Sequence, residues 1–135
     1  MNETVNEPDP AHLFVYGTLQ PGETRWHHLA PFVAGDGVDD SVRGALFDTE
    51  LGYPAARFDH DGVIVGRVYE LLDGRSALEH LDDVEGAVRG LYRRTVVVTH
   101  GNVRAWAYEC GDALLLVRHL PHGDWRQRSP TGSWG

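Results

Sequence analysis

An acidic residue at the end of the most regular helical pattern is the first candidate for chemistry. In DGRSALEHLDDVEG (73–86), apolar residues recur at the spacing of one helix face. At about 100° per residue, Glu85 falls at about 340° from Leu78, between the directions of Leu78 and Leu81. Burial and the negative end of the helix dipole would both raise the pKa of such a carboxyl group. Glu85 is therefore a candidate general base.

A second interpretation of Glu85 remains open. Gly86 follows it directly, and glycine commonly ends helices. A residue in a frayed last turn can point to solvent, and Glu85 would then have no chemical role.

The segment YGTLQPG (16–22) is the second candidate, because a strongly apolar stretch runs straight into it. A glycine at this point lets successive N–H groups face one spot, where they can hold an anion. A Cβ at Gly17 would then either strain a positive φ or crowd the bound anion. The alternative is a tight exit from a strand, with Gly17 supplying a flexible dihedral.

Other reactive residues give weaker patterns. The sequence contains no G-x-S-x-G, P-loop or G-x-G-x-x-G motif. His27 and His28 are adjacent, so their side chains diverge on a helix, and His119 with His122 lacks further ligands at a suitable spacing. Cys110 is expected to be a small core residue. We therefore predict neither a metal nor a cofactor.

Composition limits the partners and the location. The chain of 135 residues has a net charge of −8, and all 12 basic residues are arginine. The electrostatic field of this negative charge repels phosphate backbones and anionic lipids, so we expect no nucleic-acid or membrane partner. The lysine-free, acidic composition fits either genome composition or a saline cytoplasm. A polar N-terminus and the lack of an apolar run of about 20 residues predict a cytoplasmic protein.

The elements that must position these residues are mostly strands. In the segment 12–16, the residues that would point to either face of a strand are mostly apolar, which predicts a strand buried on both faces. Short helices are expected at 23–30, with Thr24 as its cap, and at 73–86. Further strands are predicted in VRGALFDT (42–49), PAARF (54–58), 63–72, and a hairpin of 91–100 and 103–110 around Gly101-Asn102.

This order predicts an α+β fold with a small mixed, mainly antiparallel β-barrel and two flanking helices. We expect one domain over residues 12–125. Residues 1–11 are predicted to be a disordered tail, and residues 126–135 a loose C-terminal tail.

Four segments together resemble the gamma-glutamylcyclotransferase-like family. They are FVYGTLQPG, GYPA, LDDVEG followed shortly by LYRR, and a late HGDW, and they span about residues 12–125. The resemblance is to short bacterial and archaeal members and to the related gamma-glutamylamine cyclotransferases. It implies a barrel with a pocket at its mouth.

The resemblance also implies roles for single residues. The loop Tyr16, Gly17, Thr18 and Leu19 would bind a glutamyl head, and Glu85 would be catalytic. Two tyrosines would lie near the pocket, Tyr92 in LYRR and Tyr53 in GYPA.

The implied reaction needs no covalent nucleophile. The α-amine of a gamma-glutamyl amide attacks its own γ-carbonyl and releases 5-oxoproline with a free amine, while Glu85 moves the proton. The alternative is a non-catalytic module that binds a carboxylated metabolite. The sequence identifies neither the leaving amine nor the choice between a monomer and a homodimer.

Overall fold

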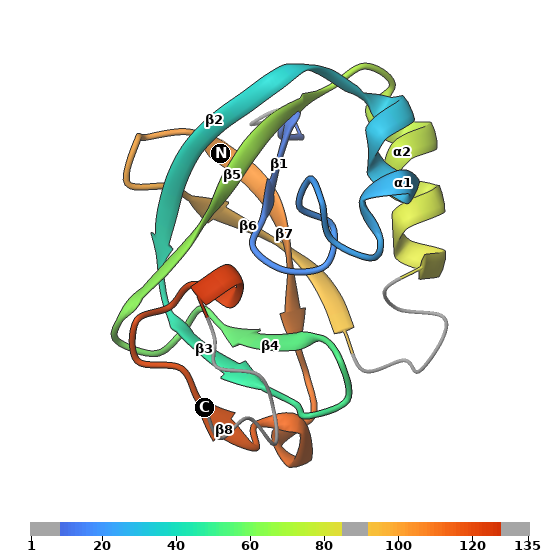
Figure 1. Ribbon diagram of the computed structural model, residues 1–135. Coiled ribbons are helices and arrows are strands. Elements are labelled where there is room, and N and C mark those ends of the chain that lie inside the picture. Colours follow the sequence, from blue (N-terminus) through green and yellow to red (C-terminus); the bar gives the residue numbers. More distant parts are fainter. Residues whose placement is uncertain (1–8, 85–91, 128–135) are drawn as a thin grey trace, which may run out of the picture.

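The computed structural model describes residues 9–84 and 92–127. Three layers stack on one another: two helices, a five-stranded sheet and a three-stranded sheet (Figure 1). The α+β class and the two helices are therefore confirmed.

The larger sheet has the order β2-β5-β1-β7-β6. Its strands are β1 (His12–Val15), β2 (Val33–Arg43), β5 (Val63–Leu71), β6 (Tyr92–Val98) and β7 (Arg104–Cys110). Neighbouring strands run antiparallel except β1 and β7, which are parallel. The predicted hairpin around Gly101-Asn102 is present as β6 and β7, with Tyr92 opposite Cys110. The sheet is thus mixed and mainly antiparallel, as expected.

The predicted barrel is wrong, because the sheet does not close on itself. In the described part of the chain β2 and β6 are the two edge strands. The turn after β6 reaches β2 through a hydrogen bond from His100 N–H to Ser41 O (2.8 Å), but no ladder continues from it among these residues. The remaining strands, β3 (Ala45–Asp48), β4 (Pro54–Arg57) and β8 (Arg118–His119), form a separate sheet in the order β4-β3-β8.

β1 lies at the centre of the larger sheet and is buried on both faces. The exposed fractions of Leu13, Phe14 and Val15 are 0%, 1% and 2%. Leu13 and Val15 join the core on the helix side, whereas Phe14 and Tyr16 join the core beneath the smaller sheet. This alternation confirms the prediction for 12–16 and places the end of β1 between two packed layers.

The first helix is shorter than predicted, and the described part of the second lies within the predicted range 73–86. α1 spans Trp26–Leu29 and continues as a 3-10 turn over Ala30–Phe32, while α2 spans Gly74–Asp82. Thr24 does not cap α1: Arg25 occupies that position without a side-chain cap, and its N–H donates to Thr18 O (2.8 Å). That bond holds the chain before Trp26 in a loop. No helix among the described residues is long and apolar enough to cross a membrane.

β2 is much longer than its sequence suggested. The segment 33–41 is rich in glycine and aspartate, which normally favour turns, yet it pairs with β5 over most of its length. The pairing register shifts between Ala34 and Val38, and Gly37 there has a φ of +71°. A Cβ on Gly37 would lie 2.8 Å from the Tyr69 ring, so the irregular backbone brings β2 close against that ring.

Candidate functional site

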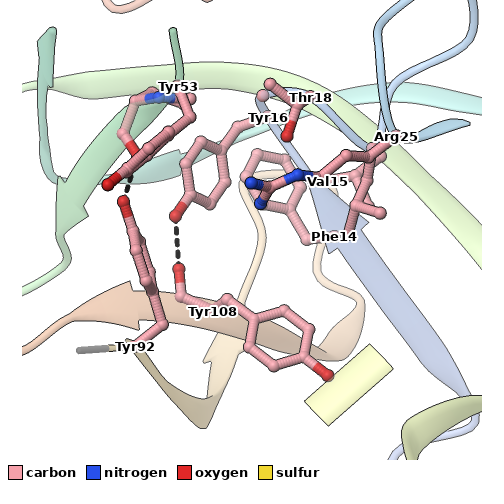
Figure 2. Close-up of a pocket in the computed structure, with 11 residues that line it drawn as sticks. Phe14, Val15, Tyr16, Thr18, Arg25, Tyr53, Tyr92 and Tyr108 are labelled. Carbon is pink, nitrogen blue, oxygen red and sulfur yellow. Dashed lines mark hydrogen bonds between the residues drawn. The ribbon is translucent and has the colours of Figure 1, made fainter. Parts of the chain in front are cut away.

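A pocket opens where β1 ends. Eleven residues line about 380 Å³ of empty space, part of it open to solvent. They come from the end of β1 and the loop after it, the start of β4, and strands β6 and β7. Figure 2 shows the side chains of Tyr16, Arg25, Tyr53 and Tyr92 around one space, which Tyr108 borders with its backbone carbonyl. Segments distant in the sequence therefore form this pocket together.

All six substrate-binding residues predicted from the sequence line this pocket. They are Tyr16, Gly17, Thr18, Leu19, Tyr53 and Tyr92. The three segments that carry them share neither a strand nor a hairpin, so the pocket results from the packing of the smaller sheet on the larger one. Their role as ligand-binding residues remains a prediction.

The loop after β1 is held by local hydrogen bonds. Gln20 N–H donates to Gly17 O (3.0 Å), and Arg25 N–H donates to Thr18 O (2.8 Å). Thr18 and Leu19 are only 6% and 5% exposed. Among the residues that the structure describes, the N–H groups of Thr18 and Leu19 donate to no protein acceptor. Buried amide donors normally have a partner, so this loop can serve an oxygen ligand in the pocket.

A positive φ, one of the two reasons expected for Gly17, is wrong. Its backbone does not have a positive φ, unlike Gly22 three residues after Leu19. A Cβ at position 17 would instead lie 2.5 Å from Pro54 Cγ and 3.0 Å from Pro54 Cδ. The proline ring at the start of β4 therefore packs directly on the bare backbone of the loop.

Tyrosines form much of the wall. The Tyr53 and Tyr92 rings lie edge to face with their centroids 6.1 Å apart. The Tyr92 hydroxyl donates to Pro54 O (2.7 Å), and the Tyr16 hydroxyl donates to Tyr108 O. Figure 2 shows both hydrogen bonds as dashed lines. These bonds tie the loop after β1 and β4 to the β6–β7 pair, and so fix the shape of the pocket.

Sequence reasoning missed Arg25 and Tyr108. The guanidinium Cζ of Arg25 lies 5.5 Å from the centroid of the Tyr53 ring, and both residues line the pocket. Arg25 belongs to no motif, and its loop bond to Thr18 brings it back to the end of β1. Tyr108 lies within strand β7, and nothing in the sequence around it distinguishes it from an ordinary strand residue. Its position beside the pocket could therefore not be predicted locally.

A hydrogen-bonded cluster lies beside the pocket at the end of α2. Arg94 donates twice to the Asp82 carboxylate (2.9 and 3.1 Å), and the Tyr108 hydroxyl donates to Asp82 as well (2.7 Å). Burial pushes the pKa of Asp82 up, but the hydrogen bonds from Arg94 and Tyr108 outweigh it, so the pKa lies below its usual value. The Arg94 guanidinium also stacks on the Trp106 ring at 4.3 Å. The cluster fixes the last turn of α2 to β6 and β7.

Glu85, the predicted catalytic residue, lies outside the described residues. The described part of α2 supports the apolar stripe from which it was predicted, since Ala77 and Leu81 are both fully buried. Both interpretations of Glu85 therefore remain open.

The described ranges 9–84 and 92–127 contain no group of three His, Cys, Asp or Glu side chains placed to hold a metal ion. His119 packs on Phe47 in the smaller sheet, with the rings tilted and their centroids 5.2 Å apart, and His122 accepts a hydrogen bond from Asp124 N–H (3.1 Å). The two histidines therefore have local structural contacts.

Comparison with known proteins gives consistent matches. The family described as "Gamma-glutamyl cyclotransferase, AIG2-like" matches residues 13–127. Over 127 residues the chain is 30% identical to the gamma-L-glutamyl-butirosin B gamma-glutamyl cyclotransferase of Niallia circulans, covering 86% of this chain and 76% of that protein.

Two solved structures share the fold. An uncharacterised protein from Pyrococcus horikoshii superposes with a TM-score of 0.70 at 23% identity, covering 87% of this chain and 91% of the other. An AIG2-like protein from Mus musculus gives a TM-score of 0.64 at 23% identity, covering 93% and 94%. The family match spans every described segment that lines the pocket. The chain therefore belongs to the AIG2-like gamma-glutamyl cyclotransferase family.

Proposed function

We propose that the protein is a gamma-glutamylcyclotransferase-type enzyme that releases 5-oxoproline and a free amine from a gamma-glutamyl amide. The observation that carries this proposal is the convergence of the Tyr16–Leu19 loop with Tyr53 and Tyr92 on one pocket. Family membership and the name of the Niallia circulans relative support the reaction type.

The reaction would use the substrate's own nucleophile. The α-amine attacks the γ-carbonyl, a five-membered ring closes, and the bond between the γ-carbon and the leaving nitrogen breaks. A well-oriented intramolecular attack reaches effective molarities of about 10⁵–10⁸ M. The task of the pocket is therefore to fold the glutamyl chain back on itself and to assist proton transfer.

The proposed roles follow from the lining residues. The backbone N–H groups of the buried residues Thr18 and Leu19 would donate hydrogen bonds either to the substrate carboxylate or to the oxyanion that develops on the γ-carbonyl. Tyr16, Tyr53 and Tyr92 would enclose the folded chain. Glu85 would take a proton from the α-amine and deliver it to the leaving nitrogen, a form of help worth about 10²–10⁴-fold in rate.

A substrate screen tests the proposal. Purified protein is incubated with glutathione, gamma-glutamyl dipeptides, gamma-glutamyl-ε-lysine and gamma-glutamylated small amines, and 5-oxoproline is measured by mass spectrometry. We expect release from at least one of these classes. A matched panel of α-glutamyl amides is the control, because their α-amine and γ-carboxylate leave no γ-amide to cleave.

A non-catalytic binding module is the alternative that the same screen separates. Such a module would bind 5-oxoproline or a gamma-glutamyl amide in calorimetry without releasing product from any member of the panel. That result would contradict the enzymatic proposal.

A further inference from the structure

We propose that Arg25 holds the free carboxylate of the ligand in the pocket, so that the protein selects glutamyl heads with an intact α-carboxylate. This inference rests on the proposed function for the identity of the ligand. It adds a residue that no sequence motif indicated.

The position of Arg25 is built into the loop. Its N–H donates to Thr18 O (2.8 Å), and its carbonyl accepts a bond from His28 N–H (3.0 Å) at the start of α1. The next residue, Trp26, packs its ring on Tyr69 with centroids 5.4 Å apart. The backbone from which the guanidinium extends is therefore anchored on both sides, and this limits the entropy lost when a ligand binds.

The side chain extends into the pocket. Its Cζ lies over the Tyr53 ring at 5.5 Å from the centroid, within the range of a cation–π contact. In Figure 2 the guanidinium points toward the centre of the lining side chains, on the side of Tyr16 and Thr18. A planar guanidinium fixed by an aromatic face is suited to two parallel hydrogen bonds with a carboxylate.

The charge of the pocket favours the same ligand. Of the eleven described lining residues, Arg25 alone carries a formal charge at neutral pH, and none is acidic. The whole chain has a net charge of −8, so a cation among the described lining residues does not follow from the general composition. Thr18 and Leu19 are buried and line the same space, and their backbone N–H groups are neutral donors close to the cation. A carboxylate is the group that such a set of donors recognises best.

The test compares two ligands of similar shape, one with a carboxylate and one with a neutral carboxamide in its place. 5-Oxoproline and its carboxamide have nearly the same shape, but only the acid is an anion. Binding of each to the parent, Arg25→Gln and Arg25→Lys is measured by titration calorimetry. The control variant is Arg43→Gln. Arg43 lies at the end of β2, does not line the pocket, and forms an exposed ion pair with Asp61, so this change removes the same charge elsewhere.

We expect the parent and Arg43→Gln to bind the acid more tightly than the carboxamide. Arg25→Gln should weaken the affinity for the acid about 10- to 100-fold, as expected for loss of a charge-assisted hydrogen bond. The affinity for the carboxamide should change by no more than about twofold. Arg25→Lys should recover part of the preference. A role confined to packing on Tyr53 would instead weaken both ligands equally, and this result would overturn the proposal.

Other outcomes separate this proposal from the proposed function. If the parent releases 5-oxoproline but Arg25→Gln still binds the acid more tightly than the carboxamide, the role of Arg25 is overturned and the enzymatic proposal stands. Arg25-dependent binding of the acid without any turnover supports Arg25 and contradicts the enzymatic proposal. A parent that binds the acid no better than the carboxamide overturns the role of Arg25.

Discussion

Pro54 and Gly17 lie in contact, and this contact makes a single methyl group at position 17 a sharp probe of the pocket. Gly17→Ala places a Cβ where the Pro54 ring lies, so the ring and the adjacent Tyr53 must shift. We expect weaker binding of 5-oxoproline, with a larger loss for Gly17→Val. Thr18→Ser keeps the hydroxyl and should bind within a few-fold of the parent. Calorimetry of the folded variants measures this, and parent-like binding by Gly17→Val would contradict a ligand role for the loop.

Glu85 gives the second prediction at this scale. Glu85→Gln keeps the shape of the side chain but removes the proton carrier, so 5-oxoproline formation should fall by at least about 10²-fold. The matched control is Glu79→Gln on α2, where the side chain is 74% exposed and pairs with Arg75 at the surface. Initial rates on the best substrate of the screen provide the measurement. A Glu85→Gln variant with a rate close to that of Glu79→Gln would show that Glu85 is not catalytic.

At the scale of elements, Asp82 connects the end of α2 to β6 and β7. Asp82→Asn weakens the two bonds from Arg94 and the one from Tyr108. We expect a loss of about 1–2 kcal/mol in the free energy of unfolding, because the site is partly solvated. Urea titration measures it, with Asp83→Asn as an exposed control.

The pKa of Asp82 also determines the pH range of this effect. Since the folded-state pKa lies below the ordinary value, the unfolded chain binds more protons in acid. The stabilisation is therefore present above about pH 4 and is lost as the pH falls below it. An Asp82→Asn variant should lose less stability than the parent in that range, and equal losses would contradict the assigned role.

The contact between α1 and α2 predicts a second pH effect, nearer neutrality. His28 Nδ1 and His80 Nε2 are 3.1 Å apart. Burial lowers the pKa of His28, and the charges of His27, His80 and Arg25 lower it further. The unfolded chain therefore takes up this proton at a higher pH than the folded one, so stability should decline as the pH falls from about 7.5 through the ordinary histidine pKa.

The variant His28→Gln tests this effect. It retains a hydrogen-bonding side chain but cannot titrate, so its stability should decline less than the parent's between about pH 7.5 and 5.5. Thermal unfolding across this range measures the difference. His60→Gln, an exposed histidine outside this contact, is the control. Parallel curves for the parent and His28→Gln would show that the contact has no pH sensitivity.

At the scale of the whole molecule, the proposed reaction needs no metal, because attack occurs within the substrate and one carboxyl group moves the proton. We expect activity to survive exhaustive chelation with EDTA. The control is a chelated sample that is then supplied with Mg²⁺, Mn²⁺ or Zn²⁺ in turn. Loss of activity on chelation, with recovery by one particular ion, would contradict the prediction.

The fold was predictable where the pattern depends on neighbouring residues. A strand buried on both faces at 12–16, the helix near 74–82 and the hairpin around Gly101-Asn102 are all present. Their signals are periodicity and turn chemistry, which act over a few residues. Long-range pairing has no such local signal. No strand was predicted for the glycine- and aspartate-rich segment 33–41, but β5 provides the hydrogen-bonding partner that makes it a strand.

For the candidate site, the sequence by itself determined the segments and the residue types, through the YGTL, GYPA and LYRR motifs. Tertiary structure alone decided that these segments meet, that the sheet stays open, and that Pro54 rather than a positive φ requires Gly17. It also placed Arg25 and Tyr108 in the pocket. The physical reason is that a motif specifies local backbone and side chains, whereas convergence depends on how distant strands pack.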